Sequence, residues 1–504
     1  MAQHKDLGVN RREFLQRAGW GAAFAGGAVT MGSTWPGVAM AQAAAGGPAF
    51  LAGWAVESIT PDKPVQLAGQ FAERVSRQVL DPCLATALAL ERTGDNGEKE
   101  QAILVSCDLV NVNRESVEAI RESVAQRLPD FDARKLIINT SHTHTGPTLR
   151  PGIYREPDEG VMGPREYAPF FRARAEEAAV RAWSDRQPGA VSHALGRAAV
   201  GFNRIAVYAD GTAKMYGNSN QPDFRGLEGG CDHGVELLYL WDAEGGLTGI
   251  VINVACPSQV VEGQLYVSAD FWGALRKLVA ERYGEGVHVY PMTGAAGDQS
   301  PRDLVRRGRG EPDMRKEEGM NEMARRIMHA IGETIEQARS EQDAAPLFMH
   351  RVEEITLPVR RATEQEAAEA RAEVDRLTAE GSPKPGSRDQ AMLRRAKGVV
   401  DRFAQQDETP GYAMDLHAIR LADVAIVTNP FELYLEYGEQ IKARSKAKQT
   451  LIAQLSGDRG GYLPTVRAVA GGAYGSRITE NRVGPEGGDM LVEHSVTAIN
   501  THWE

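Results

Sequence analysis

The chain has 504 residues, of which 42% are hydrophobic and 25% are charged, a composition typical of a soluble globular protein. Its formal net charge is −11 and no basic region offsets it, which argues against nucleic acid as the main partner. Beyond the N-terminus no apolar run reaches the length of a membrane-spanning helix, so we expect no transmembrane segment in the mature chain.

The first 41 residues resemble a cleavable export signal. A pair of arginines is followed by a weakly apolar run rich in glycine and alanine, and Ala39-Met40-Ala41 offers the small residues that a signal peptidase needs. We therefore expect a twin-arginine signal over 1–41 and a mature bacterial protein over 42–504, either periplasmic or at the cell surface or secreted. This route carries folded proteins, often with their cofactor, so it suits a metalloprotein. An ordinary N-terminal helix is the alternative.

The first half of the mature chain predicts a βαβ unit. Ala102–Cys107 is a buried strand by its apolar run, and Asn113 can cap a helix over Arg114–Leu128. Leu136–Asn139 is the next strand, and short links between strand, helix and strand indicate a parallel pair. In such sheets the chemistry gathers just beyond the carboxyl ends of the strands.

Two histidines directly follow the second of these strands, in the stretch NTSHTHTGP at Asn139–Pro147. Alternation by two places His142 and His144 on the same side of an extended segment. Two imidazoles on one face can share a metal, or pair a metal with a polarised substrate oxygen. A solvated loop that happens to hold two histidines is the alternative.

The rest of the chain continues the alternation of strands and helices. A loop of four residues joins two strand-like runs, 236–242 and 247–255, and predicts a hairpin. The remaining expected elements are helices at 165–186, 271–283 and 312–340 and strands at 287–290, 414–421, 424–427 and 450–455. Residues 363–406 predict a helical hairpin broken at GSPKPGS, which either shapes a pocket or is a solvated excursion. With no internal repeat, we expect a single large α/β domain: a mixed β-sheet flanked by helices, with its active site at the carboxyl ends of strands.

Reactive side chains fall close to the ends of five expected strands. They are His142, Cys256, Ser300, Glu432 and Tyr462. Neighbouring strand ends of one sheet converge on one crevice, so these side chains are expected to meet there. Imidazole, thiolate and carboxylate are the usual zinc donors.

The motifs that contain these residues resemble those of the neutral/alkaline non-lysosomal ceramidases, in their N-terminal catalytic domain. SHTHTGP is similar to the family's THTHSGP, GDQSP to GDVSP, NPFE to its Pro-Gly-Glu-Phe segment and GYLPT to GYVTT. The resemblance covers about Gly53 to Tyr474. It implies a Zn2+ ion held by His142, Glu432 and Tyr462 together with a fourth ligand.

The same resemblance implies roles for five further residues. Ser300 corresponds to the family's active-site serine, and His144 to a histidine beside the substrate. Tyr474 corresponds to a tyrosine that supports the oxyanion, and Arg204, in FNRI, to an arginine of the site. Asp298 either orients Ser300 or His144 or stabilises its own turn.

The chain departs from the family pattern at two points. The family's second zinc histidine lies fourteen residues before an aspartate, and that offset from Asp270 falls on Cys256. A thiolate is a competent zinc ligand that makes the metal a poorer Lewis acid, while a buried core cysteine, in a site without metal, is the alternative. From the resemblance we also expect the family's β-rich C-terminal domain to be absent, which puts the lipid specificity in doubt. The basic stretch RDLVRRGRGEP could attract an anionic substrate or be a solvated loop.

We therefore expect an exported zinc-dependent hydrolase of an amide (N-acyl) or related bond, acting on a small-molecule or lipid-like substrate. The metal would polarise the scissile carbonyl, and water or Ser300 would attack it while His144 and Tyr474 support the oxyanion. Two alternatives remain: a metal-dependent hydrolase of a carbohydrate or other non-lipid substrate, and a non-catalytic ligand-binding protein on the same scaffold.

Overall fold

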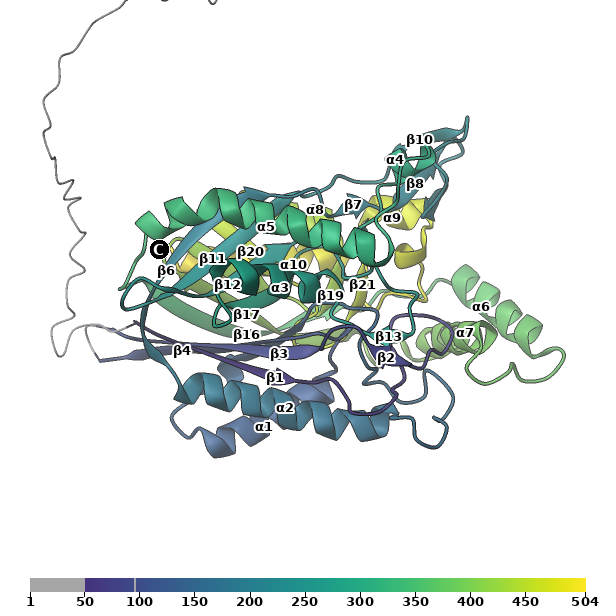
Figure 1. Ribbon diagram of the computed structural model, residues 1–504. Coiled ribbons are helices and arrows are strands. Elements are labelled where there is room, and N and C mark those ends of the chain that lie inside the picture. The colour runs from purple at the N-terminus through teal and green to yellow at the C-terminus, as the bar shows by residue number, and fades with distance from the viewer. Residues whose placement is uncertain (1–49, 95–96) are drawn as a thin grey trace, which may run out of the picture. The chain divides into compact units, whose positions relative to one another are not determined.

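The computed structural model describes residues 50–94 and 97–504, and the expected export signal over 1–41 lies outside them. The expected α/β class is confirmed: a large mixed sheet and a smaller second sheet are flanked by helices (Figure 1). None of the helices in the described residues combines the length and the apolar character that a membrane span requires.

The large sheet has eight strands in the order β14-β12-β11-β6-β1-β3-β4-β5. Their bounds are His288–Thr293, Leu247–Val254, Gly234–Asp242, Gln187–Arg197, Phe50–Ser58, Leu84–Thr93, Lys99–Cys107 and Leu136–Thr140. The outermost pair on each edge, β12 with β14 and β4 with β5, is parallel, and the other pairs are antiparallel. The βαβ unit and the hairpin expected from the sequence are both present.

The second sheet has four strands in the order β16-β17-β18-β20. Their bounds are Phe348–Pro358, Gly411–Leu421, Val424–Thr428 and Gln449–Ala453. The remaining short strands are β2 (Gln78–Val79), β7 (Phe202–Asn203), β8 (Ile205–Tyr208), β9 (Ala213–Met215), β10 (Phe224–Leu227), β13 (Tyr266–Val267), β15 (Gln299–Ser300), β19 (Phe431–Leu433) and β21 (Gly461–Leu463).

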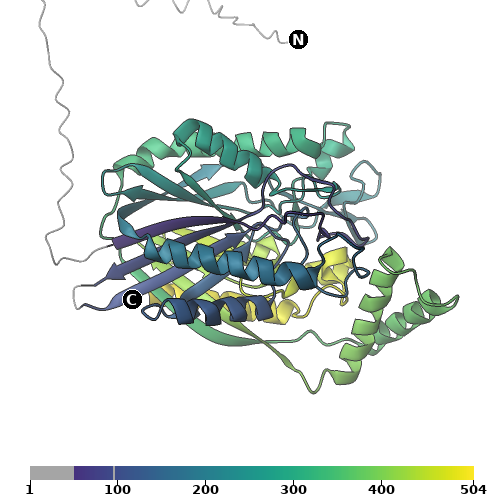
Figure 2. The same ribbon diagram turned by 60° about the horizontal axis from the view of Figure 1, so that its bottom comes forward.

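Ten α-helices lie in the described residues. They are α1 (Arg114–Arg127), α2 (Pro164–Ser184), α3 (Phe271–Tyr283), α4 (Leu304–Gly308), α5 (Lys316–Ser340), α6 (Glu364–Thr378), α7 (Arg388–Gln405), α8 (Leu435–Arg444), α9 (Val466–Gly471) and α10 (Pro485–Thr501). The helices α6 and α7 form the hairpin at 363–406 and project beyond the ends of the strands (Figure 2). Thr363 caps α6 with a full capping box, and Ser387 caps α7, so each helix has its own start signal.

The two sheets pack face to face, and the side chains between them alternate along each strand. Leu88 and Leu90 of β3 point to the second sheet, while Ala85, Ala87 and Ala89 point to α1 and α2 on the outer face. The helices α3 and α5 cover the other part of that outer face, and α8 and α10 cover the second sheet. The layers are therefore helix, sheet, sheet and helix.

A chain of hydrogen bonds crosses the buried space between the sheets and requires two neutral histidines. Arg121 donates to Nε2 of His417 (3.2 Å), Nδ1 of His417 donates to Nε2 of His350 (3.0 Å), and Nδ1 of His350 donates to the carbonyl of Gln101 (3.0 Å). These directions follow because Arg121 can only donate and the carbonyl can only accept. Burial lowers the pKa of His350 to about 3 and holds the pKa of His417 well below its ordinary value.

Stability should therefore fall as the pH drops below 6.5, the ordinary histidine pKa. Below pH 6.5 these histidines bind protons in the unfolded chain but stay neutral in the folded chain. Each of them therefore lowers the free energy of unfolding by about 1.4 kcal/mol per pH unit between 6.5 and its folded pKa. The measurement is denaturant unfolding at pH 7.5 and 5.5. The double variant His350→Gln/His417→Gln should lose less stability on acidification than the wild type, whereas His329→Gln, an exposed histidine of α5, should match the wild type. An equal acid loss in the double variant would contradict the assignment.

Candidate active site

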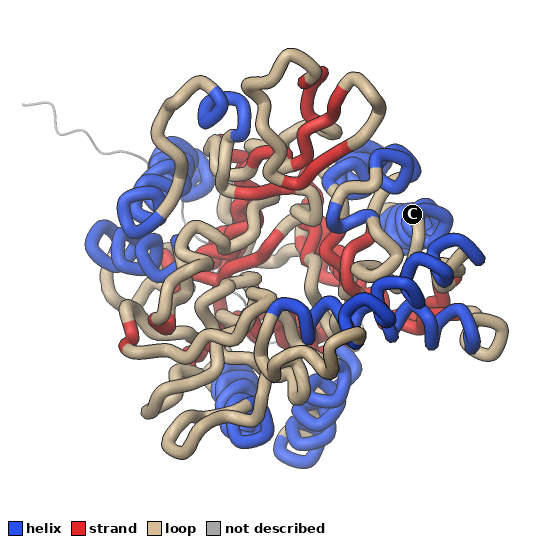
Figure 3. Tube along the Cα trace, turned by 90° about the vertical axis from the view of Figure 1, so that its right-hand side faces the viewer, coloured by secondary structure: helices blue, strands red, loops and turns tan. Residues whose placement is uncertain are grey.

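A cavity of about 370 Å³ opens where the carboxyl ends of several strands meet. Hydrogen bonds tie these ends together: Gly457 after β20 donates to the carbonyl of Ile138 in β5 (2.9 Å), and Thr293 of β14 donates to the carbonyl of Thr140 (3.3 Å). Figure 3 looks at this loop-rich end, from the side where Figure 1 places α6 and α7. His142, His144, Arg204, Glu432, Tyr462 and Tyr474 are among the lining residues.

His142 lies two residues beyond the end of β5 in a left-handed backbone conformation, with φ 61°. Such strain in a residue with a side chain is sustained only when its surroundings fix it, and it is common at functional sites. The imidazole is buried and its Nδ1 donates to the carbonyl of Val110 (2.7 Å). This bond fixes the ring so that Nε2 faces into the cavity, as in metal-binding histidines.

The protonation of His144 follows from its neighbours. Arg204 can only donate, so Oε1 of Gln259 is the acceptor of their 3.3 Å bond and the Gln259 amide nitrogen donates to Nε2 of His144 (2.9 Å). The proton of a neutral His144 therefore lies on Nδ1, which faces Oε2 of Glu262 at 3.7 Å. Burial, and after it the neighbours His142, Arg74 and Arg204, hold the pKa of His144 well below its ordinary value, so the ring is neutral at pH 7.

Glu432 and Tyr462 lie opposite each other on the parallel pair β19 and β21. Their side chains are hydrogen-bonded, and the Tyr462 hydroxyl also accepts from Arg204 (3.1 Å). Burial raises the pKa of Glu432, but its neighbours His142 and Arg204 lower it by more, so its pKa lies below its ordinary value and it is a carboxylate at pH 7. Burial and Glu432 raise the pKa of Tyr462, which remains a phenol.

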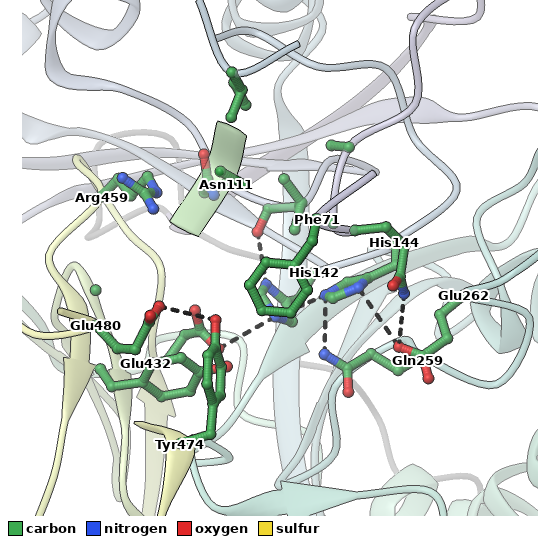
Figure 4. A pocket seen from close by; sticks show the side chains of 18 of the residues that line it. Phe71, Asn111, His142, His144, Gln259, Glu262, Glu432, Arg459, Tyr474 and Glu480 are labelled. Atoms are coloured by element: carbon green, nitrogen blue, oxygen red, sulfur yellow. Dashed lines mark hydrogen bonds and ion pairs between the residues drawn. The ribbon is translucent and has the colours of Figure 1, made fainter. Parts of the chain in front are cut away.

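Three acceptor atoms meet around His142 (Figure 4). Its Nε2 lies 3.5 Å from Oε2 of Glu432 and 3.3 Å from Nε2 of His144, and in neutral rings with their protons on Nδ1 neither nitrogen carries a proton. Lone pairs that face one another repel, and a cation or an extra proton between them removes the repulsion. Over residues 50–94 and 97–504, no three histidine, cysteine, aspartate or glutamate side chains are grouped to hold a metal ion. His142 and Glu432 still fit a metal ion when the hydroxyl oxygen of Tyr462 is counted as the third donor.

Cys256 lies apart from the other three expected ligands. It follows β12, it is fully buried, and its thiol donates to the carbonyl of Val200 (3.1 Å) rather than lining the cavity. Burial and the charge of Asp270 raise the pKa of Cys256, which keeps it a thiol. The four cysteines all lie in the described part of the chain and none of them forms a disulfide. The four-ligand set that includes Cys256 is therefore not assembled.

Ser300 and Asp298 lie behind the cavity rather than on its wall. Ser300 is fully buried on β15, and its hydroxyl accepts from the backbone N–H of Arg302 (3.1 Å). Asp298 accepts from the side chain of Asn203 and from the backbone N–H of Leu435, both at 2.9 Å. These bonds make Asp298 a brace between segments, and it contacts neither Ser300 nor His144 through its carboxylate.

Tyr474 lines the cavity, but its hydroxyl is engaged. It donates to Oε2 of Glu480 (2.8 Å) and accepts from Arg395 of α7 (3.2 Å). Arg395 also pairs with Glu480 (3.1 Å) and lies over the ring of Phe71, 4.3 Å from its centroid. The hairpin α6–α7 therefore forms one wall of the site through α7.

Comparison with solved structures gives two similar chains. The structure of neutral ceramidase from Pseudomonas aeruginosa matches with a TM-score of 0.64 and 16% identity, over 90% of this chain and 75% of that one. A ceramidase complexed with C2 matches with a TM-score of 0.65 and 15% identity over the same shares. The chain has the neutral ceramidase fold. No protein-family model matches the sequence. No curated protein matches it either.

Within this neutral ceramidase fold, the residue that the sequence analysis missed is Gln259. It joins Arg204 to His144 and sets the tautomer of the histidine. The available signal was its position three residues after Cys256, directly beyond the end of β12. A glutamine with neither charge nor metal affinity gave no reason to single it out.

Gly69 holds His144 in place by leaving room for its ring. Gly69 has φ +93°, and a Cβ there would lie 2.4 Å from Cγ of His144. We expect Gly69→Ala to displace the imidazole and to lower the activity of the site at least about tenfold, since misplacement of about 1 Å can cost 10²-fold. The matched control is Gly211→Ala, which has φ +84° and open space around the added methyl group. Equal activities of the two variants would contradict a positioning role for Gly69.

Proposed function

We propose that the chain is a hydrolase that cleaves an amide (N-acyl) or related acyl bond in this cavity. The observation that carries the proposal is the convergence of His142, Glu432 and Tyr462 from three distant segments. These are the positions at which the sequence resembles the metal-binding motifs of the ceramidases. The shared fold with two ceramidase structures supports the same class of reaction.

We also propose that His142, Glu432 and Tyr462 bind one zinc ion, which would supply Lewis acidity toward a carbonyl oxygen. Nitrogen and oxygen donors of this kind are common around zinc. Cys256 is left out of the ligand set because its thiol bonds to a carbonyl away from the cavity. Three protein ligands leave a position open for substrate or water, as in catalytic zinc sites.

The residues of the chain would then act as follows. Arg204 neutralises Glu432 and fixes the Tyr462 hydroxyl, so the two oxygens stay in place during the reaction. His144, neutral at pH 7 and without a proton on Nε2, is the proposed proton acceptor for an attacking water, which would take the place of the Gln259 N–H at Nε2. Water is preferred to Ser300 as the nucleophile because the serine hydroxyl does not line the cavity. Tyr474 and Asp298, already engaged elsewhere, act in this scheme as supports.

The test combines the metal content with the activity of the purified mature protein. Elemental analysis should find about one zinc per wild-type chain and per Cys256→Ala chain, and much less in His142→Ala. Hydrolysis of N-acyl amides should follow the zinc content across these three proteins. Loss of zinc in Cys256→Ala with retention in His142→Ala would overturn the ligand assignment. Zinc binding without hydrolysis of any acyl or carbohydrate substrate would favour a non-catalytic ligand-binding protein.

Export through the twin-arginine route remains part of the proposal. It rests on the arginine pair and the small residues at Ala39-Met40-Ala41 in the sequence. Replacing both arginines with lysine should retain the protein in the cytoplasm of a bacterial host. Cell fractionation measures this directly, and unchanged export of the lysine variant would contradict the route.

A further inference from the structure

The cavity is cationic, although the chain as a whole is acidic. The formal net charge of the chain is −11, yet the charged lining of the cavity comprises three glutamates and twice as many arginines. The arginines are Arg150, Arg204, Arg302, Arg394, Arg395 and Arg459, and the glutamates are Glu262, Glu432 and Glu480. Arginines concentrated in a concave site raise the local concentration of anions.

Three of these arginines are already matched within the site. Arg302 pairs with Glu262 (2.5 Å), and Arg395 pairs with Glu480 (3.1 Å). Arg204 donates to the carbonyl of Gly297, to Gln259 and to Tyr462, and it is attracted by Glu432. Each glutamate of the lining therefore has its own cationic partner. None of the other arginines forms an ion pair with an acidic side chain of the cavity within the described residues, although Glu432 attracts Arg459.

The other three arginines come from distant parts of the chain and have no ion pair among the described residues. Arg394 of α7 donates only to the carbonyls of Gly152 and Ile153 (3.1 and 2.9 Å). Arg150, in the loop after β5, and Arg459, in the loop before β21, make no side-chain hydrogen bond within residues 50–94 and 97–504. Both are exposed to solvent on the cavity wall, so a ligand can reach them.

These unpaired guanidiniums influence one another. Restricted solvation and the positive charges of its neighbours, first Arg459 and then Arg394, lower the pKa of Arg150 to about 9. Burial and the same kind of repulsion, from Arg395 and Arg459, lower the pKa of Arg394. The mutual repulsion of these like charges on one cavity destabilises the empty site, and an anion bound between them would remove it. Figure 4 shows Arg459 on the same side of the site as Glu480 and Asn111, across from His144.

We propose that Arg150, Arg394 and Arg459 form a subsite for an oxyanion (phosphate, sulfate or carboxylate) that the substrate carries beside its scissile acyl bond. Guanidinium groups match such oxyanions through paired hydrogen bonds, and several of them select the more highly charged group. The subsite lies on the same cavity as His142 and Glu432, so the anionic group is part of the substrate rather than a separate ligand. The assignment to a substrate rests on the proposed hydrolase, whereas the binding of the anion does not.

The first experiment measures anion binding by isothermal titration of the wild type with inorganic phosphate, sulfate and acetate. We expect phosphate and sulfate to bind more tightly than acetate, and the double variant Arg150→Gln/Arg459→Gln to weaken phosphate binding at least tenfold. The matched control is Arg309→Gln, which removes one charge from the exposed basic stretch after Ser300 and should bind phosphate like the wild type. Thermal unfolding without phosphate should give Arg309→Gln the wild-type midpoint and should not lower the midpoint of the double variant, because its replaced side chains have no ion pair to lose and their repulsion is removed.

Binding that survives in the double variant, or that is lost equally in Arg309→Gln, would overturn the subsite. So would tighter binding of acetate than of phosphate. The second experiment compares kcat/KM for an N-acyl ethanolamine with kcat/KM for its O-phosphate. The wild type and Arg309→Gln should prefer the phosphorylated amide at least tenfold, and the double variant should lose this preference. Phosphate binding without hydrolysis of either amide would contradict the proposed hydrolase but support the anion subsite. Hydrolysis without phosphate binding, and without a preference for the phosphorylated amide, would support the hydrolase but contradict the subsite.

Discussion

Replacing Glu432 with glutamine is expected to lower kcat/KM for N-acyl amide hydrolysis by a factor of about 10²–10³. The substitution keeps the shape of the side chain and removes its charge. Arg204 would then be a buried cation without its counter-charge, and His142 would lose the oxygen that lies 3.5 Å from its Nε2. Zinc content should fall together with the activity.

The control for this variant is Glu336→Gln, which changes an exposed glutamate on α5 in the same way. Its activity and zinc content should match those of the wild type. Steady-state kinetics and elemental analysis on the same samples provide the comparison. Wild-type kcat/KM in Glu432→Gln would remove the carboxylate from the chemistry and, with it, the main argument for the site.

Replacing Asp108 with alanine is expected to lower the free energy of unfolding by about 3–5 kcal/mol. Asp108 is fully buried at the end of β4, where it accepts hydrogen bonds from Arg276 (2.6 Å) and from the backbone N–H of Leu84 (2.9 Å). Removing it leaves the largely buried guanidinium of Arg276 without its counter-charge. The variant also frees the hydroxyl of Ser141, which donates to Asp108 (2.9 Å) and precedes the strained His142.

Denaturant unfolding followed by circular dichroism measures the loss. Glu493→Gln breaks an exposed pair with Arg444 at the same distance of 2.6 Å and should leave the unfolding midpoint unchanged. A similar small effect in Asp108→Ala would show that the Arg276 ion pair contributes little to stability. Any activity that remains in Asp108→Ala should be lower than in the wild type, because the backbone at His142 loses its support.

The fold and part of the site could be predicted from the sequence because they depend on local rules. The apolar runs and the short links between them predicted β4, α1 and β5. The parallel pairing of the two strands predicted that His142 lies at the end of a strand. The same rule, together with the motif resemblance, placed Glu432 and Tyr462 on neighbouring strand ends, and the structure brings their side chains into contact. Position along a strand is encoded locally, so the sequence carries it.

The direction of a side chain beyond a strand end is not encoded in this way. The offset from Asp270 singled out Cys256, but the turn after β12 directs its thiol toward the carbonyl of Val200. The same holds for Arg150 and Arg459, which are loop residues without periodicity and meet only when distant loops pack together. Arg394 lies on a helix that was expected either to shape a pocket or to be a solvated excursion, and its role depends on where α7 docks.

The division of the site between two sheets has a consequence for biosynthesis. His142 follows a strand of the large sheet, whereas Glu432 and Tyr462 lie on the separate short pair β19 and β21, almost three hundred residues or more further along the chain. During synthesis on the ribosome, the nascent chain contains His142 long before the segments that carry Glu432 and Tyr462 have emerged. The proposed hydrolytic activity would therefore arise late in synthesis, and its acquisition would report completed assembly of the site.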